Sequence, residues 1–570
     1  MASLALAIRV AIALSTQGFF QPDEYFQALE PAHHYVFGYG HLTWEWVSPA
    51  PLRSIIYPAL NIPPFWLIKT LGLDARYPEL LIAGPRVVHG LLAAITDIGI
   101  REITRRVLND AFVSTAYFVS LTSLFHSLSL SRSMSNSLET SLTTAALSYY
   151  PWNNARSIQV QSHLIRNRTR MRMCIVFAAL ACAIRPTNAI IWVYMFGVLF
   201  LRLGLRLSQG FILIRDCCVV GGMTTLAVFV LDSAFYGKPT LSLLNFLRVN
   251  ASPVSLFYGS SPWHYYVSQA LPILCSTSLP FVLHGMHLAV QNDEKNLKTM
   301  FGCIFWTLAV FSFVGHKEWR FLHPLLPMLH VFASRSLVEL HHCSAKAEVK
   351  VPREKRKNAI SKTFSLPIRT RDLCLLLLAV PALIYVVFFH CVGQIKVMSY
   401  LRSLPPENLA SVGFLTPCHS TPWQAYLHRP ELAAPGRMWA LGCEPPLGLQ
   451  HPSDYKDQTD IFFEAPLEYM RTHFPSRVDT SYPPSAFPSS VPNVTFVETL
   501  QVMEQSSRSW DLGWQHEWPQ YIVLFGALLR EPGVLDLFRN QSYEEVWKGG
   551  FEWEGEGQRR GAVRVWKHIR

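Results

Sequence analysis

Long apolar segments dominate the first 392 residues and constrain the fold more than any other feature. Half of the 570 residues are hydrophobic and 16% are charged, against roughly 25% charged in an average soluble domain. A helix needs about 20 apolar residues to cross a bilayer. The pattern therefore predicts a polytopic α-helical membrane protein. The candidate spans are 3–20, 79–100, 111–130, 134–150, 173–184, 187–204, 211–231, 265–290, 299–315, 322–340 and 373–392.

The basic residues indicate how these spans are oriented. If the amino terminus is cytosolic and every span crosses, most Lys and Arg residues between spans fall in cytosolic loops, as the positive-inside rule requires. The net charge of +11 is then explained by anionic lipid headgroups, so membrane lipids are expected partners and nucleic acid is not. The first span has Arg9 and an apolar core like a signal peptide, but it lacks a small-x-small cleavage site, which favours a retained helix.

The same topology divides the chain into two domains. Residues 1–392 form the membrane domain, with a first lumenal loop at 20–78, and residues 393–570 form a lumenal carboxyl-terminal domain. The latter is rich in Pro, Trp and charge, and alternating residues at 521–525 and 562–566 predict strands. A mixed α/β or β-rich fold is expected there.

Cysteine and histidine spacing gives little indication of a metal. Most of the 11 cysteines lie in apolar spans, where they act as small hydrophobic residues. Beyond residue 392 only Cys418 and Cys443 remain, a candidate disulfide if that side is oxidising. No CxxC or HExxH spacing occurs, so neither a metal nor a cofactor is expected.

Two adjacent carboxylates follow the first apolar segment. Asp23 and Glu24 stand at a predicted membrane surface, where a carboxylate is costly without a partner or a function. An acidic first turn of a helix after Pro22 is the alternative explanation. In such a helix Asp23, Gln27 and Glu30 would share one face, and Pro31 would end or kink it.

An aromatic segment completes this loop. Trp44, Glu45 and Trp46 follow a Gly-rich stretch beginning at Phe37. Interfacial anchoring explains each tryptophan. Sugar recognition, in which rings stack on the sugar and carboxylates accept its hydroxyl hydrogens, is the functional alternative.

A second charged group lies between two later spans. His316, Lys317, Glu318 and Arg320 occur within six residues. Fixed cations at this depth suit a phosphate ester, which arginine can bind with two parallel hydrogen bonds. Arg185 interrupts another apolar stretch and is a third candidate. The alternatives are interfacial snorkelling for the block, with Glu318 paired to a neighbouring cation, and an ordinary charged loop for Arg185.

These motifs together carry a family resemblance. The segments Pro22–Glu24, Phe37–Trp46, His316–Phe321 and Pro417–Pro422 resemble the dolichyl-phosphate-mannose-dependent mannosyltransferases of glycosyltransferase family 22, in the GT-C superfamily. Gln21 departs from the family, where histidine commonly precedes Pro-Asp-Glu. The forms LTWEW and PCHSTP are most similar to the branch that acts on the GPI-anchor precursor.

The resemblance implies a reaction and a place for it. An enzyme of the endoplasmic reticulum membrane, with its catalytic loop and carboxyl-terminal domain in the lumen, would transfer mannose from dolichyl phosphate β-mannose to the dimannosyl precursor. This is the third mannose, added in α-1,2 linkage with inversion. Asp23 would be the base, with Glu24 its rival. Lys317, Arg320, His316 and Arg185 would hold the phosphate, and Gln27, Glu30, Trp44, Glu45 and Trp46 would contact acceptor sugar.

Other functions remain open from the sequence. A sister enzyme for the fourth GPI mannose or for the N-glycan precursor would share this chemistry. A lipid transporter or scramblase would use the charges near the spans differently, and a scaffold subunit would use the acidic loop only as a helix cap. The sequons at Asn250, Asn493 and Asn540 fall on the predicted lumenal side and are candidate glycosylation sites.

Overall fold

The computed structural model describes residues 2–152, 168–203, 207–250, 252–349, 366–445, 455–485 and 514–569. The chain divides into two compact units. The helical unit comprises Met1–Leu14, Arg86–Val230 and Gly259–Val386, and the sheet unit comprises Ser15–Pro85, Leu231–Tyr258 and Val387–Arg570. The first loop therefore belongs to the same unit as the carboxyl-terminal region. The predicted boundary between 392 and 393 separates membrane from lumenal chain and stays a prediction.

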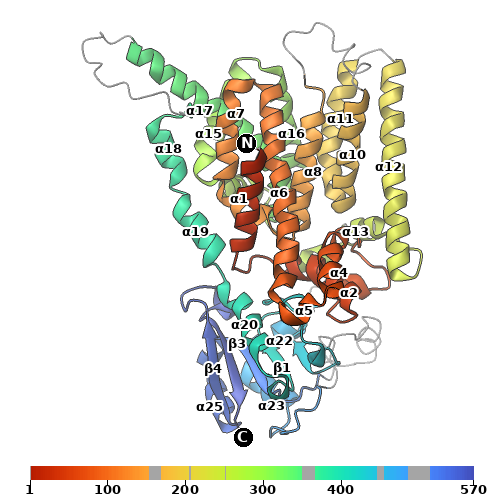
Figure 1. Ribbon diagram of the computed structural model, residues 1–570, viewed down its shortest axis with the longest axis vertical. Helices are drawn as coiled ribbons and strands as arrows, with labels where there is room; N and C mark the ends of the chain where they lie inside the picture. Colours follow the sequence, from red (N-terminus) through yellow and green to blue (C-terminus); the bar gives the residue numbers. More distant parts are fainter. Residues whose placement is uncertain are drawn as a thin grey trace. The chain divides into compact units, whose positions relative to one another are not determined.

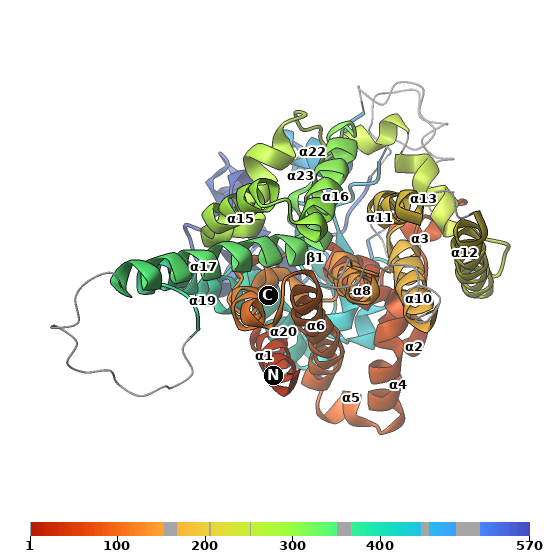
Figure 2. The ribbon, with the colours of Figure 1, turned by 90° about the horizontal axis from the view of Figure 1, so that it is seen from above.

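The helical unit is built from helices that pack against one another, some of them far apart along the chain (Figure 1). Close pairs are α8 with α10, α15 with α17, and α11 with α16. Viewed from above, α8, α10 and α11 are seen nearly end-on (Figure 2). The helices with most or all of their length in this unit are α1 (Ala2–Ser15), α6 (Glu79–Val107), α7 (Val113–Leu121), α8 (Ser135–Tyr149), α10 (Arg168–Ile184), α11 (Ala189–Leu203), α12 (Leu207–Tyr236), α14 (Leu271–Cys275), α15 (Leu279–Gln291), α16 (Lys295–Ser312), α17 (Leu326–Val349), α18 (Thr370–Leu377) and α19 (Val380–Phe388).

Each predicted span contains helix over much of its length. Within the described residues, five helical stretches are long and apolar enough to cross a membrane by length and composition: Glu79–Val107, Pro186–Leu203, Gln209–Tyr236, Tyr266–Gln291 and Thr370–Ser403. The other predicted spans coincide with α1, α7, α8, α10, α16 and α17, which are shorter or more polar. Polar helices of this kind are tolerated where their polar side chains face other helices rather than lipid.

A five-stranded mixed sheet organises the second unit. The strand order is β2-β1-β3-β5-β4. The pairs β1–β2 and β1–β3 are parallel, and β3–β5 and β4–β5 are antiparallel. The strands are β1 (Val412–Leu415), β2 (Met438–Ala440), β3 (Tyr521–Phe525), β4 (Tyr543–Gly549) and β5 (Val563–His568). The predicted strands at 521–525 and 562–566 are confirmed, and the expected mixed α/β fold is the one observed.

The first loop covers one face of this sheet. Side chains alternate along a strand, and in β3 Val523 points into a core that also contains Tyr25 and Phe65 from the first loop. Ile522 points into the opposite core, with Phe462 from α22. The helices of this unit are α2 (Glu30–Phe37), α3 (Trp44–Val47), α4 (Ile62–Thr70), α5 (Leu73–Arg76), α13 (Ser242–Asn250), α20 (Val392–Ser403), α21 (Gln424–Leu427), α22 (Gln458–Glu464), α23 (Pro466–His473) and α25 (Val534–Asn540).

Candidate functional site

The two predicted catalytic carboxylates lie at the start of a helix in the first loop. Asp23 is half-buried and Glu24 is 4% exposed. A π-helical turn, Tyr25–Leu29, follows them and leads directly into α2. The helix therefore does not end at Pro31, because the wider turn places the proline in the first turn of α2, where its missing N–H is tolerated.

Glu30 occupies a structural position. Its side chain is fully buried, and its carboxylate accepts backbone hydrogen bonds from His41 at 2.9 Å, Gln424 at 3.2 Å and Ala425 at 2.8 Å. Burial raises the pKa of Glu30 to about 7, against the effect of these three bonds. The carboxylate joins the first loop to α21, and contact with an acceptor sugar would require this arrangement to open.

The other predicted sugar-binding residues differ in what they contact. Gln27 donates a hydrogen bond to Glu45 at 3.1 Å, and Glu45 is paired with Arg53 at 2.5 Å. Trp46 is 2% exposed and donates to the Phe26 carbonyl at 3.1 Å. These contacts fix the loop. Trp44, in contrast, lines a pocket.

Tyr57 lies close to the two predicted catalytic carboxylates, Asp23 and Glu24. Its side chain is 5% exposed. Burial raises the pKa of Tyr57 well above its usual value, and the charges of Glu24 and Asp23 add to the effect. The phenol therefore stays protonated beside the two carboxylates. The residue lies more than 30 positions along the chain, so spacing alone gave no indication of this contact.

In the helical unit, Glu318 is the centre of the cationic block. Its carboxylate accepts hydrogen bonds from Arg320 at 2.5 and 2.8 Å and contacts His316 at 3.2 Å. Burial would raise the pKa of Glu318, but Arg320 and His316 outweigh it and hold that pKa well below the usual range. The hydrogen bond to Glu318 in turn raises the pKa of His316. The pairing expected of the snorkelling alternative is therefore present.

Arg185 joins this block through an aromatic ring. The guanidinium groups of Arg185 and Arg320 lie 5.2 and 5.9 Å from the centroid of the Phe321 ring, close enough for cation–π attraction. Arg185 also contacts Glu139 at 3.3 Å. Lys317 is 7% exposed and donates to the Ser261 carbonyl at 2.8 Å. Three cationic side chains and two carboxylates thus gather in and around this block.

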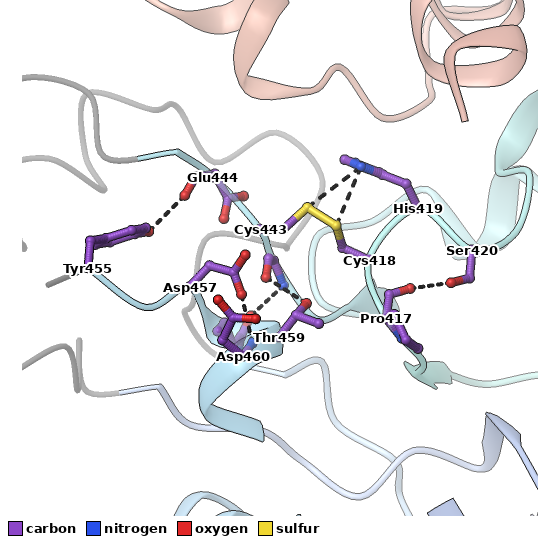
Figure 3. Close-up of a disulfide and its surroundings, with 12 residues drawn as sticks. Pro417, Cys418, His419, Ser420, Cys443, Glu444, Tyr455, Asp457, Thr459 and Asp460 are labelled. Atoms are coloured by element: carbon purple, nitrogen blue, oxygen red, sulfur yellow. Dashed lines mark hydrogen bonds between the residues drawn. A yellow bond between two sulfur atoms is a disulfide. The ribbon is translucent and has the colours of Figure 1, made fainter. Parts of the chain in front are cut away.

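Cys418 and Cys443 form a disulfide with a Cα–Cα distance of 6.0 Å (Figure 3). It joins the loops that follow β1 and β2. Nδ1 of His419 lies 3.7 Å from each sulfur. Among the described residues, this group and His390–Cys391–Glu554 are the two that bring three potential metal ligands together. Because the first pair of sulfurs is bonded to each other, only the second group could offer thiolate to an ion.

The candidate glycosylation sites fall in different places. Asn250 ends α13, is exposed, and donates to the Phe246 carbonyl at 2.8 Å. Asn540 ends α25 and is exposed. Asn493 lies outside the described residues. Modification of all three stays a prediction.

Comparison with known proteins identifies the family. The model of the Alg9-like mannosyltransferase family matches residues 1–428. The chain belongs to this family. The mannosyltransferase is 35% identical over 478 residues to GPI mannosyltransferase 3 of Yarrowia lipolytica, covering 83% of each chain. It is 33% identical to human GPI alpha-1,2-mannosyltransferase 3, covering 82% of this chain and 76% of the relative. It is 34% identical to the mouse protein of that name, covering 83% and 78%.

A solved structure supports the fold. The mannosyltransferase is similar to the crystal structure of ArnT from Cupriavidus metallidurans bound to undecaprenyl phosphate, with a TM-score of 0.52 at 12% identity, covering 100% of this chain and 97% of ArnT. The chain thus has the fold of a GT-C membrane glycosyltransferase. With its apolar helices, it is a multi-pass membrane enzyme.

Proposed function

We propose that this mannosyltransferase adds the third mannose to the GPI-anchor precursor, taking it from dolichyl phosphate β-mannose. The observation that carries the proposal is the positively charged cluster of Arg185, Lys317 and Arg320, in a chain that belongs to a sugar transferase family. The names of the curated relatives support GPI as the acceptor and α-1,2 as the linkage.

The reaction is a single displacement with inversion. The 2-hydroxyl oxygen of the acceptor mannose attacks the anomeric carbon of the donor. The bond from that carbon to the phosphate oxygen breaks, and its electron pair stays on the phosphate. Asp23 takes the hydroxyl proton, because a half-buried carboxylate at a helix start can act as a general base. Glu24 is more buried than Asp23 and supports it, so Asp23 is the proposed base.

The cationic cluster stabilises the leaving group. Arg320 is already oriented by two hydrogen bonds to Glu318, so little rearrangement is needed when negative charge develops on the phosphate. Lys317 and Arg185 add further charge. These fixed cations make a metal or cofactor unnecessary, and we expect a chelator to leave turnover unchanged.

The proposed setting is the endoplasmic reticulum membrane, with the first loop and the sheet unit in the lumen. An oxidising lumen suits the Cys418–Cys443 disulfide. The donor and the acceptor are both lipid-linked, which explains why the enzyme is embedded in the membrane.

The test uses purified full-length enzyme with dolichyl phosphate mannose and three acceptors: the dimannosyl GPI precursor, the trimannosyl GPI precursor and the N-glycan precursor. We expect transfer to the dimannosyl precursor alone. Asp23→Asn should lower turnover by roughly 10²–10⁴-fold. Asp536→Asn, an exposed aspartate in the first turn of α25, is the matched control and should be unaffected. Transfer to another acceptor, or near wild-type turnover by Asp23→Asn, would contradict the proposal.

A further inference from the structure

A pocket of about 540 Å³, counting the open space at its mouth, lies inside the sheet unit. Residues 41–44 of the first loop form one wall. Phe414 of β1, the loop after it from Thr416 to Trp423, and residues 440–444 at the end of β2 form the other. The LTWEW and PCHSTP motifs, far apart in the sequence, therefore line one cavity.

Aromatic rings form the frame of the pocket. Phe26 and His419 have ring centroids 4.4 Å apart, and His41 and Trp423 have centroids 5.9 Å apart. Trp44 completes the lining and is 9% exposed. Flat apolar rings with polar groups between them are the usual composition of a site for a hydroxylated ring ligand.

Two polar atoms in this lining lack partners. Within the described part of the chain, Thr43 Oγ1 and His41 Nδ1 are buried and make no hydrogen bond. Thr43 is 5% exposed and precedes α3, yet its hydroxyl makes no capping bond. A buried polar group without a partner costs about 1–3 kcal/mol, so these atoms are suited to a ligand that supplies the missing hydrogen bonds.

The pocket adjoins the proposed base. His419 lines it and lies near enough to Asp23 for the carboxylate charge to act on the ring. Burial lowers the pKa of His419 to about 4, and the charge of Asp23 partly offsets that effect. Burial likewise lowers the pKa of His41 to about 3. Both imidazoles are therefore neutral near pH 7, and each ring can donate one hydrogen bond and accept another.

The charges of the lining favour one kind of ligand. None of the described residues lining the pocket is Lys or Arg, and Glu444 adds a carboxylate. Such a lining repels an anionic phosphate and accepts uncharged hydroxyl groups. The donor phosphate is thus a poor occupant, whereas a neutral hexose of the acceptor fits the chemistry.

We propose that this pocket binds the terminal mannose of the acceptor glycolipid, with Thr43 and His41 as hydrogen-bonding partners and Trp44 and Trp423 as stacking surfaces. The inference rests on the proposed function and assigns the acceptor subsite within it. A mannose held here lies beside Asp23, where its hydroxyl can lose a proton to the carboxylate.

The experiment measures KM for acceptor and donor separately in the purified full chain. Thr43→Val and His41→Phe keep side-chain shape while removing the unpartnered atoms. Thr472→Val, an exposed threonine in α23, is the matched control. We expect each pocket variant to raise acceptor KM about three- to tenfold, the value of one lost hydrogen bond, with donor KM unchanged. The thermal transition shows that each variant is folded.

Other outcomes overturn the assignment. A rise in donor KM would show that the pocket binds the donor. Unchanged KM values for both donor and acceptor would show that it binds neither. Binding of methyl α-mannoside, followed by saturation-transfer NMR, separates this inference from the proposed function. If the wild type transfers no mannose to the GPI precursor but binds the mannoside and the two variants do not, the pocket stands and the acceptor is another mannoside. If the wild type binds no mannoside and transfers none, the pocket assignment fails as well.

Discussion

Arg9 and Asp97 form a fully buried ion pair that fastens α1 to α6. Arg9 Nε and Nη2 donate to the two carboxylate oxygens at 2.7 and 2.9 Å, and both side chains are 0% exposed. Ser120 completes the network: its carbonyl accepts from Arg9 at 2.9 Å and its hydroxyl donates to Asp97 at 2.7 Å. This buried network thus joins three helices, α1, α6 and α7.

Removing only one charge of this pair should destabilise the helical unit more than replacing both charged residues with apolar ones. Asp97→Asn leaves the Arg9 charge buried without its partner, which costs about 3–5 kcal/mol. We expect a lower thermal transition in detergent and reduced membrane accumulation. The double variant Arg9→Met with Asp97→Leu removes both charges and should recover most of the loss. A single variant as stable as wild type would contradict this account.

The helices could be predicted from the sequence, but this ion pair could not. Apolar runs set the positions of the spans, as α6 and α12 show, because burial in lipid needs a minimum length. Arg9 was noted only as a charge typical of a signal peptide. Its partner is 88 residues away, and a contact at that separation depends on helix packing that periodicity does not determine.

The two hydrogen bonds from the Arg320 guanidinium to Glu318 should contribute to kcat beyond the effect of the positive charge alone. Arg320→Lys keeps the positive charge but cannot make both hydrogen bonds to Glu318. We expect kcat to fall by at least about tenfold, since a misplaced cation stabilises the leaving phosphate poorly. Arg335→Lys is the matched control, because Arg335 is also paired with two carboxylates, Glu294 and Glu339. Equal kcat values in both variants would show that the charged residues at 316–320 act as interfacial anchors and not in catalysis.

The candidate site could be predicted in part. Adjacent carboxylates at 23–24 and clustered cations at 316–320 stand out because unpaired charge is costly near lipid. Glu30 was grouped with them by helical spacing, yet its position is set by backbone donors from residues 424 and 425, which no local pattern reveals. The pocket was missed for the same reason, as its walls come from segments nearly 400 residues apart.

Acid should destabilise the sheet unit through its buried histidines. His516 is 3% exposed and stacks between Trp439 and Phe474 at 4.3 and 4.9 Å, and burial lowers its pKa to about 3. In the unfolded chain this pKa is near 6.5, so the stability that the neutral ring contributes is present above pH 6.5 and is lost as the pH falls towards 3. At pH 5 the loss from this residue is about 2 kcal/mol.

His516→Phe separates this effect from other titrations. The phenyl ring keeps the stack but cannot be protonated, so the thermal transition of the variant should fall less than that of the wild type between pH 7 and pH 5. The variant also loses the hydrogen bonds to Gln458 and Tyr469, which lowers its stability by an amount that does not depend on the ring's protonation. Parallel pH profiles would show that His516 does not titrate in this way.

The Cys418–Cys443 disulfide should stabilise both the sheet unit and the pocket wall. It closes a loop with a sequence separation of 25, for which loop-closure entropy gives about 3 kcal/mol. Cys443 itself lines the pocket. Replacing both cysteines with serine should therefore lower the thermal transition and raise acceptor KM, while leaving donor KM near the wild-type value. Dithiothreitol should produce the same change in the wild type and none in the variant. Cys343→Ser, at an exposed free cysteine, is the control and should remain sensitive to the reductant. If the double variant keeps both its transition and its acceptor KM, the two loops are held by their packing and the disulfide adds nothing to acceptor binding.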